Sequence, residues 1–239
     1  MLHIENYSKS YGDFLAVDQL NLHVKPGTIV GFIGHNGAGK TTTLRSVAGI
    51  MDFDQGKILI DGIDILQQPM QAKAVTAFIP DNPDLYEFLS GAEYLDFISD
   101  VFHLDTAVRK DRIETYARSF EIYENLTDRI SSYSHGMKQK LALIGAMIHN
   151  PKLLLLDEPF VGLDPMAAHI LKSYLRQICD AGGAVLFSTH VLEVAQKLCD
   201  EIAIIKQGKL IIQGDTDELT RDASLEEIFL ELSQTEVTP

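Results

Sequence analysis

Apolar residues follow two patterns along this chain. Residues 28–33, 153–156 and 184–187 form short, almost unbroken apolar runs. Such runs are typical of parallel strands that are covered on both faces. Elsewhere the apolar residues recur at the three- and four-residue spacing of amphipathic helices. The pattern therefore predicts an α/β fold built around a parallel sheet.

Shorter strands are predicted on either side of the first apolar run. Apolar positions in residues 2–7 indicate a strand, and the polar stretch 8–13 indicates a turn. A second alternating stretch lies within residues 14–24, and residues 57–60 form a short apolar segment between two glycine turns. We therefore expect an antiparallel β-piece around the strand 28–33.

The middle of the chain has helical character. Apolar side chains recur with roughly helical spacing from Leu85 to Phe102, and a more polar segment follows from 105 to 124. We interpret residues 84–150 as a helical subdomain inserted into one core. The core would comprise residues 1–83 and 151–239 and include the β-piece.

The predicted elements of the last third are shorter. They are a helix over residues 166–178, a short helix over 191–198, paired strands over 202–205 and 210–212, and a final helix opened by a capping box of Ser224 and Glu227. Residues 234–239 are expected to be frayed.

Composition excludes several classes of protein. Of the 239 residues, 46% are hydrophobic and 23% are charged, as in ordinary soluble proteins. No window approaches the roughly 18 apolar residues of a membrane span, and the N-terminus lacks a secretory signal, so we expect a cytosolic protein. The formal charge of -14 disfavours nucleic acid or direct lipid insertion. Cys179 and Cys199 lack metal-ligand spacing and are expected to be buried or half-buried.

A phosphate-binding motif follows the first apolar run. Residues 34–41 fit G-x-x-x-x-G-K-[ST], between a predicted strand and a predicted helix. Glycines let backbone N–H groups converge on phosphate oxygens, and the following helix adds its N-terminal dipole. Lys40 would neutralise the β- and γ-phosphates, and Thr41 would coordinate Mg²⁺. The candidate nucleotide-binding residues here are Gly34, His35, Asn36, Gly37, Ala38, Gly39, Lys40, Thr41 and Thr42.

Four further side chains carry candidate chemistry. Asp157 and Glu158 follow a buried strand, at the sheet edge where α/β folds bind ligands. One carboxylate can orient Mg²⁺ and the other can align or deprotonate an attacking water. His190 follows the next buried strand and could reach a γ-phosphate. Tyr11 in an early loop could either pack internally or stack on a nucleobase.

A second anion site is predicted far from the first. Ser134 resembles an N-cap, and with Gly136 it opens a helix through residue 148. Nothing else in the sequence indicates a second nucleotide fold. We therefore expect Ser134 and Gly136 to serve a nucleotide bound to another copy of the domain.

Together these motifs resemble the nucleotide-binding subunit of an ATP-binding cassette (ABC) transporter, over essentially the whole chain. Residues 134–137 fall where that family has its signature Ser-Gly-Gly-Gln, and residues 162–164 fall at its D-loop. The resemblance implies that Glu158 is the catalytic glutamate, His190 the switch histidine and Tyr11 the adenine-stacking aromatic.

Two motifs depart from the family pattern. The signature carries His135 and Met137 in place of Gly and Gln, while Ser134 and Gly136 remain. Asp81 stands where the family usually has the Q-loop glutamine, as in cassettes resembling ABC-2-type exporters. A carboxylate there can approach Mg²⁺ or the attacking water but cannot donate a hydrogen bond as an amide does. Residues 89–91 mimic a signature but lie too early in the chain.

The resemblance implies a P-loop NTPase (RecA-like) core with an antiparallel β subdomain and an inserted α-helical subdomain. It implies an ATPase that uses ATP and Mg²⁺, with Thr41 and Asp157 at the metal and Lys40, Glu158 and His190 in catalysis. The expected partners are a separately encoded integral membrane permease and a second nucleotide-binding subunit, in a homodimer or heterodimer. The permease would hold this chain at the inner face of the membrane, and the chain would power transport through it, by analogy export.

Two alternatives remain at this stage. The first is a soluble ABC-family ATPase acting on nucleic acid or ribosomes, which the negative charge disfavours. The second is a non-hydrolysing nucleotide-dependent regulator, against which the presence of Glu158 speaks.

Overall fold

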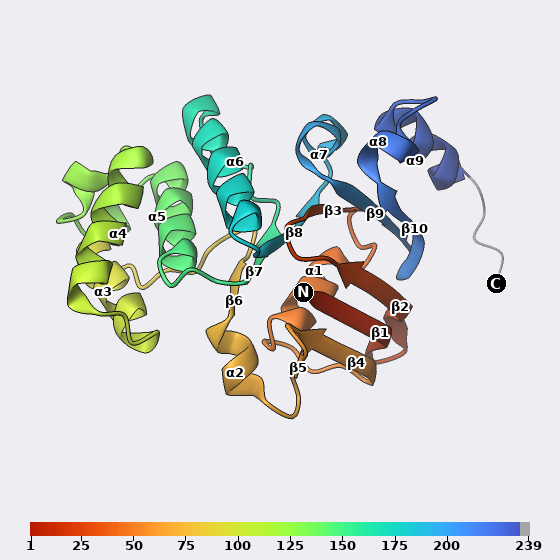
Figure 1. The fold of residues 1–239 in the computed structure, drawn as a ribbon, viewed down its shortest axis with the longest axis horizontal. Coiled ribbons are helices and arrows are strands. Elements are labelled where there is room, and N and C mark those ends of the chain that lie inside the picture. Colours follow the sequence, from red (N-terminus) through yellow and green to blue (C-terminus); the bar gives the residue numbers. More distant parts are fainter. Residues whose placement is uncertain (235–239) are drawn as a thin grey trace.

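The computed structural model describes residues 1–234 of the chain, and within them the strands form two sheets (Figure 1). The larger sheet runs in the order β10 (Lys209–Asp215), β9 (Glu201–Lys206), β3 (Ile29–Ile33), β8 (Ala184–Thr189), β7 (Leu153–Asp157) and β6 (Thr76–Ile79). Its strands pair in parallel except for β10, which runs antiparallel to β9. The predicted parallel sheet is confirmed.

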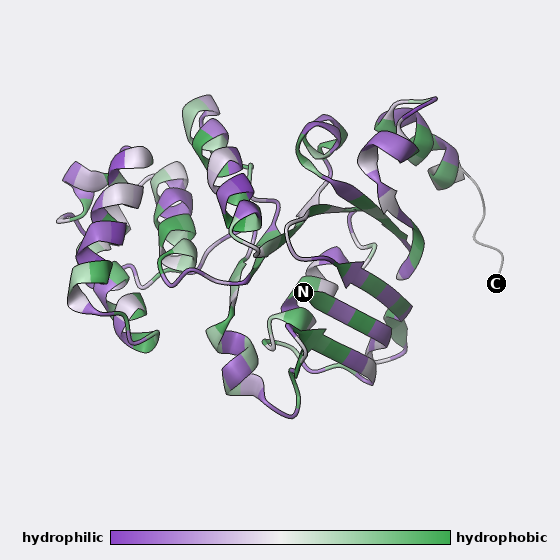
Figure 2. Ribbon diagram, in the orientation of Figure 1, coloured by the Kyte–Doolittle hydropathy of each residue, from purple (hydrophilic) through white to green (hydrophobic). Residues whose placement is uncertain are grey.

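The smaller sheet is antiparallel. It runs in the order β2 (Phe14–Val24), β1 (Leu2–Tyr11), β4 (Gln55–Ile60) and β5 (Ile63–Asp64). Its long strands alternate hydrophobic and hydrophilic residues, which Figure 2 shows as green and purple bands. One face of this sheet is therefore built to pack inward, and the other faces solvent.

Helices surround the two sheets. They are α1 (Lys40–Val47), α2 (Pro69–Ala74), α3 (Gly91–Val101), α4 (Thr106–Ser119), α5 (His135–Met147), α6 (Pro165–Asp180), α7 (Leu192–Leu198), α8 (Thr216–Leu219) and α9 (Leu225–Gln234), with 3₁₀ turns η1 (Tyr123–Asn125) and η2 (Ile130–Ser132). Between β6 and β7 the chain is helical, and α3, α4 and α5 lie to one side of the sheets in Figure 1.

The parallel sheet is shared by two hydrophobic cores. Ile29 and Ile33 of β3 belong to a core built with the helices, whereas Val30 and Phe32 belong to a core that includes the antiparallel sheet and α1. Successive strand residues point to opposite faces, so a strand covered on both faces reads as an unbroken apolar run. This explains why the sequence pattern identified these strands.

Two predicted boundaries are wrong. The helix expected from Leu85 begins only at Gly91, because Ser90 caps it: the Glu93 N–H donates to Ser90 Oγ at 3.2 Å, and the Ser90 N–H donates to Glu93 Oε2 at 2.7 Å. The turn expected over residues 8–13 is confined to 12–13. Strand β1 continues to Tyr11 despite its polar composition, because Ser8 still pairs with β4 and residues 9–11 pair with β2.

Other expectations are confirmed. Ser224 and Glu227 make the predicted capping contacts before α9, and Cys179 and Cys199 are both buried. None of the helices within residues 1–234 is long and apolar enough to span a membrane. Of the segment expected to be frayed, 235–239 lies outside the described residues, and Gln234 is the last residue of α9.

A half-buried histidine joins two of the inserted helices. His149 lies just after α5, and its ring stacks on Phe102 at the end of α3, with ring centroids 3.6 Å apart. Burial lowers the pKa of His149 to about 4, and both ring nitrogens are buried with no hydrogen-bond partner within the described chain. The neutral ring is therefore the form that the fold accommodates.

We expect His149 to make the protein less stable in mild acid. A histidine in the unfolded chain has a pKa of about 6.5. Below that pH the His149 imidazole therefore binds a proton in the unfolded state but stays neutral in the folded state, which favours unfolding. Stability should fall by about 1 to 2 kcal/mol between pH 7.5 and pH 5 from this residue alone. Urea unfolding of wild type and His149→Phe across this pH range measures the difference. Parallel pH profiles for the two proteins would contradict the assignment.

Candidate functional site

The phosphate loop connects β3 to α1. Its glycines lie where side chains would not fit: a Cβ on Gly34 would come within 2.5 Å of the Ile205 carbonyl oxygen, and one on Gly39 within 2.8 Å of the Ala16 carbonyl oxygen. Gly39 is the N-cap of α1 and has a φ of 106°, in the region that favours glycine. The loop is thus pressed between β2 and β9, with the N-terminus of α1 at its end.

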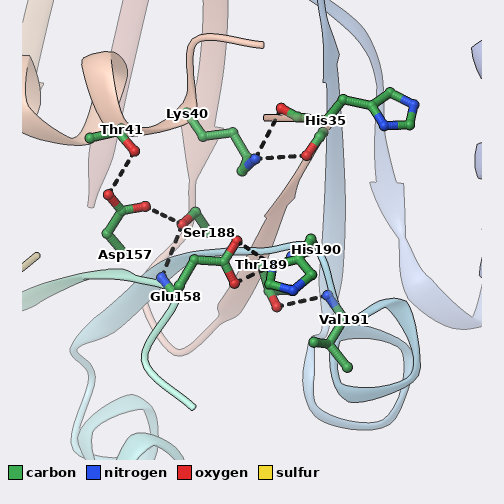
Figure 3. Close-up of polar contacts among 10 residues, drawn as sticks. His35, Lys40, Thr41, Asp157, Glu158, Ser188, Thr189, His190 and Val191 are labelled. Atoms are coloured by element: carbon green, nitrogen blue, oxygen red, sulfur yellow. Dashed lines mark hydrogen bonds and ion pairs between the residues drawn. The ribbon is translucent and has the colours of Figure 1, made fainter. Parts of the chain in front are cut away.

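Lys40 lies beneath the loop with only 6% of its surface exposed. Its Nζ donates to the carbonyl oxygens of Gly34, at 2.6 Å, and His35, at 3.2 Å (Figure 3). Burial lowers the pKa of Lys40, and the carboxylates of Glu158 and Asp157 oppose that shift. A desolvated ammonium aimed at the loop is well suited to meet an anionic group there.

Asp157 ends β7 and is almost completely buried. Its Oδ2 accepts a hydrogen bond from Thr41 Oγ1 at 2.7 Å, and its Oδ1 accepts one from Ser188 on the neighbouring strand β8. The two strands are in register here, with Asp157 opposite Ser188. The Asp157 carboxylate is therefore fixed next to the Thr41 hydroxyl in the first turn of α1.

Glu158 follows Asp157 in a left-handed backbone conformation, with a φ of 49°. Its carboxylate contacts His190 twice: Oε1 lies 2.9 Å from His190 Nδ1, and Oε2 accepts the His190 backbone N–H at 3.4 Å (Figure 3). A non-glycine residue in this conformation is often found where a functional side chain must be aimed. The carboxylate is thereby oriented at the sheet edge beside the phosphate loop.

A cavity of about 430 Å³ gathers most of the sequence-predicted residues. It is lined by Tyr11, Phe14, Ala16, Asn36, Gly37, Gly39, Lys40, Thr41, Thr42, Asp81, Asp157 and Glu158. Tyr11 is 47% exposed, and its hydroxyl lies 2.9 Å from Met51 Sδ. The cavity therefore runs from an aromatic rim, past the phosphate loop, to a carboxylate end.

The remaining predicted residues lie around or away from this cavity. Gly34, His35 and Ala38 belong to the loop without lining the cavity, and His190 joins the site through Glu158. Ser134 and Gly136 do not line it. They begin α5, where Ser134 Oγ accepts the Met137 N–H at 3.3 Å.

The start of α5 packs against the segment that follows Glu158. A Cβ added to Gly136 would lie 3.0 Å from the Gly162 carbonyl oxygen, and Lys140 pairs with Asp164 at 2.8 Å. Asp164 in turn caps α6. The two segments that the sequence placed at the signature and the D-loop are therefore neighbours in one chain.

Three residues of the site were missed by sequence reasoning. Phe14 pairs with Tyr11 at the tip of the β1–β2 hairpin, and both line the cavity with Ala16. Ser188 positions Asp157. The alternating pattern around residue 14 and the end of the apolar run 184–187 were the available signals. Neither identifies a site residue without the pairing of the strands.

Comparison with known proteins agrees with this arrangement. Residues 17–161 match the ABC transporter family model. The chain is 34% identical over 219 residues to the ABC transporter ATP-binding protein NatA of Bacillus subtilis, covering 90% of this chain and 89% of NatA. It is also 34% identical over 219 residues to the Nod factor export ATP-binding protein I of Cupriavidus metallidurans, covering 92% and 72% of the two chains.

A solved structure described as an ATP binding subunit of an ABC transporter superimposes with a TM-score of 0.94. It is 33% identical in sequence, and the match covers 98% of this chain and 100% of that one. The α/β fold with its phosphate loop, antiparallel sheet and helical insertion is thus that of an ABC ATPase. The chain belongs to the ABC transporter family, in which it is an ATP-binding subunit with ATPase activity.

Proposed function

We propose that this subunit binds MgATP in the cavity beside the phosphate loop and hydrolyses it to drive transport through a separate membrane subunit. The observation that carries the proposal is the convergence of Lys40, the Thr41–Asp157 pair and the Glu158–His190 pair at one sheet edge. Phosphoryl transfer to water requires a positive charge near the phosphates, oxygen ligands for a metal ion and a base for the attacking water. Lys40, the Thr41–Asp157 pair and Glu158 supply these three at neighbouring positions.

The residues present fit a magnesium ion. Thr41 Oγ1 and Asp157 Oδ2, 2.7 Å apart, are hard oxygen donors, and Mg²⁺ is commonly bound by one or two such groups together with substrate phosphates. No cluster of three or more His, Cys, Asp or Glu side chains within residues 1–234 offers a complete cage of protein ligands. When bound, the ion would neutralise charge on the phosphate oxygens.

In this proposal each side chain has one task. Tyr11 and Phe14 receive the base at the open rim, and the amides of residues 34–41 with Lys40 hold the phosphates. Glu158 orients and deprotonates the attacking water, and His190 stabilises the γ-phosphate in the transition state. Asp81, exposed at the cavity wall, can approach the same water as an acceptor.

The site is completed by a second copy or a homologous subunit. Ser134 and Gly136 stand at the N-terminus of α5, and the first N–H groups of a helix have no partner within the helix, but both residues lie away from the cavity of their own chain. Head-to-tail pairing would bring them over the γ-phosphate of the partner. ATP then bridges the two subunits, and hydrolysis releases them.

We expect ATP to drive dimer formation in a manner that depends on Ser134. In a Glu158→Gln background, which retains ATP, Ser134→Ala should weaken the ATP-dependent dimer about tenfold through loss of one charge-assisted hydrogen bond. Light scattering across a range of protein concentrations measures this.

Ser90→Ala is the matched control. Ser90 caps α3 as Ser134 caps α5, so both variants lose an N-cap, yet Ser90 lies outside the proposed dimer contact. Ser90→Ala should dimerise like the parent. A Glu158→Gln protein that stays monomeric at saturating ATP, or equal losses in both serine variants, would contradict the proposal.

We further propose that the membrane subunit docks on an apolar groove of about 470 Å³ between the parallel sheet and the inserted helices. Its lining includes Pro80, Pro83 and Leu85 from the segment after β6, and Phe102 and Ala146 from the inserted helical segment. Tyr86, Phe88 and Phe97 form an exposed aromatic cluster in the same region. The division into core and helical subdomain would then let ATP binding move the groove. Co-purification from membranes identifies the docked subunit.

A further inference from the structure

The C-terminal helix reaches the phosphate loop. The half-buried ring of Phe229 on α9 packs against the His35 imidazole, with ring centroids 4.7 Å apart and ring planes at 52°. Figure 3 shows the imidazole of His35 pointing away from the Lys40 ammonium, while the His35 carbonyl oxygen points toward it. One loop residue therefore contacts Lys40 through its backbone and α9 through its ring.

Helix α9 is itself fixed to the core. Leu225 at its start is fully buried, and the Leu225 N–H donates to Gln196 Oε1 of α7 at 3.2 Å. Near its end, the Leu232 carbonyl oxygen accepts a hydrogen bond from Lys206 Nζ at 2.9 Å. Phe229 lies between these two attachments, so the backbone of α9 holds its ring in place against His35.

The strand that supplies Lys206 also supports the loop from the inner side. The carbonyl oxygen of Ile205, the preceding residue of β9, lies 2.5 Å from the place that a Cβ on Gly34 would take. Its side chain lies 3.4 Å from the corresponding position on Gly39. The loop thus rests on β9, and α9, which is tied to β9, braces it from outside at His35.

We propose that Phe229 is a positioning residue for the phosphate loop, acting through His35 on the carbonyl that binds Lys40. The inference rests on the proposed role of this loop in ATP binding. The His35 carbonyl oxygen also accepts the Ala38 N–H at 3.1 Å, so the Phe229 ring adds a restraint on the side chain to hydrogen bonds that already hold the peptide. Without that ring the exposed residue would sample more conformations, and ordering it would oppose nucleotide binding. Phe229 does not touch the cavity, so the chemical step is unaffected.

The test compares two substitutions of Phe229 in the full chain. Phe229→Leu keeps apolar bulk for the packing of α9 but loses the ring pair, and should raise KM and the Kd for ATP about two- to tenfold with kcat unchanged. Phe229→Tyr keeps the ring and should behave as wild type. Leu230→Ala changes the next residue of the same helix, which is 52% exposed, and should also behave as wild type. Kd is measured by calorimetry in the Glu158→Gln background.

A double-mutant cycle separates positioning from a general loss of stability. His35→Ala removes the same ring pair from the loop side and leaves every side chain of α9 in place. It should raise Kd about as much as Phe229→Leu, and the double variant should be no worse than either single one. Additive losses, an unchanged Kd in either single variant, or a fall in kcat alone would overturn the proposal. Wild-type ATP binding by Lys40→Ala would instead overturn the proposed function of the loop itself.

Discussion

Replacing Glu158 by Gln should lower ATP turnover about a thousandfold while ATP binding persists. The amide has the same shape as the carboxylate and can still contact His190, whose backbone N–H and Nδ1 meet the two Glu158 oxygens. What it loses is the ability to accept a proton from the attacking water. Turnover is followed by phosphate release at saturating MgATP, and binding by calorimetry.

A surface glutamate provides the control for this substitution. Glu193 on α7 pairs only with Lys197 among the contacts described, and both side chains are largely exposed. Glu193→Gln makes the same chemical change away from the cavity and should leave turnover as in wild type. If Glu158→Gln retained comparable turnover, Glu158 would not be the base, and another acceptor at the site, such as Asp81, would have to be tested in its place.

Replacing Gly39 of the phosphate loop by Ala should lower either the stability of the protein or its affinity for ATP. In Gly39→Ala the new methyl group would lie 2.8 Å from the Ala16 carbonyl oxygen and 2.9 Å from Val17 Cγ2, at a φ of 106°. Backbone strain and overlap together should cost roughly 3 kcal/mol or more, as lost stability or a displaced loop. A displaced loop would weaken ATP binding by about a hundredfold.

The neighbouring glycine separates strain from overlap. Gly37 has a φ of 81°, but a Cβ there would have nothing within 4 Å. Gly37→Ala should therefore cost only about 1 to 2 kcal/mol of backbone strain. Urea unfolding and ATP calorimetry on both variants give the comparison. Equal losses at the two positions would show that the close approach of β2 beneath Gly39 is unimportant.

The parts of the site fixed by local backbone geometry could be predicted from the sequence. The phosphate loop needs its glycines and Lys40 at set spacings, and the ends of the apolar runs lead to Asp157, Glu158 and His190. The structure brings all of these to one sheet edge. Their chemistry follows from their position on adjacent strands, which a regular parallel sheet determines.

What the sequence could not predict depends on contacts between distant segments. The spacing from Leu85 onward resembles a helix, but only Leu85 and Leu89 of this irregular segment pack on the core, whereas Phe88 is 71% exposed; the Ser90 cap marks the true start. The contact of Phe229 with His35 joins the last helix to the first loop. A hydrophobic position in an amphipathic helix carries no information about which residue it meets.

The distance of Ser134 from the cavity of its own chain has a genetic consequence under the head-to-tail arrangement. Suppose that a chain defective at Lys40 is expressed together with a chain defective at Ser134. Their mixed pairs would have one intact composite site, with Lys40 from the second chain and Ser134 from the first. The same two lesions placed on one chain and paired with a normal chain would damage both composite sites. Under that arrangement, complementation between defective alleles would be decided by which chain carries which lesion.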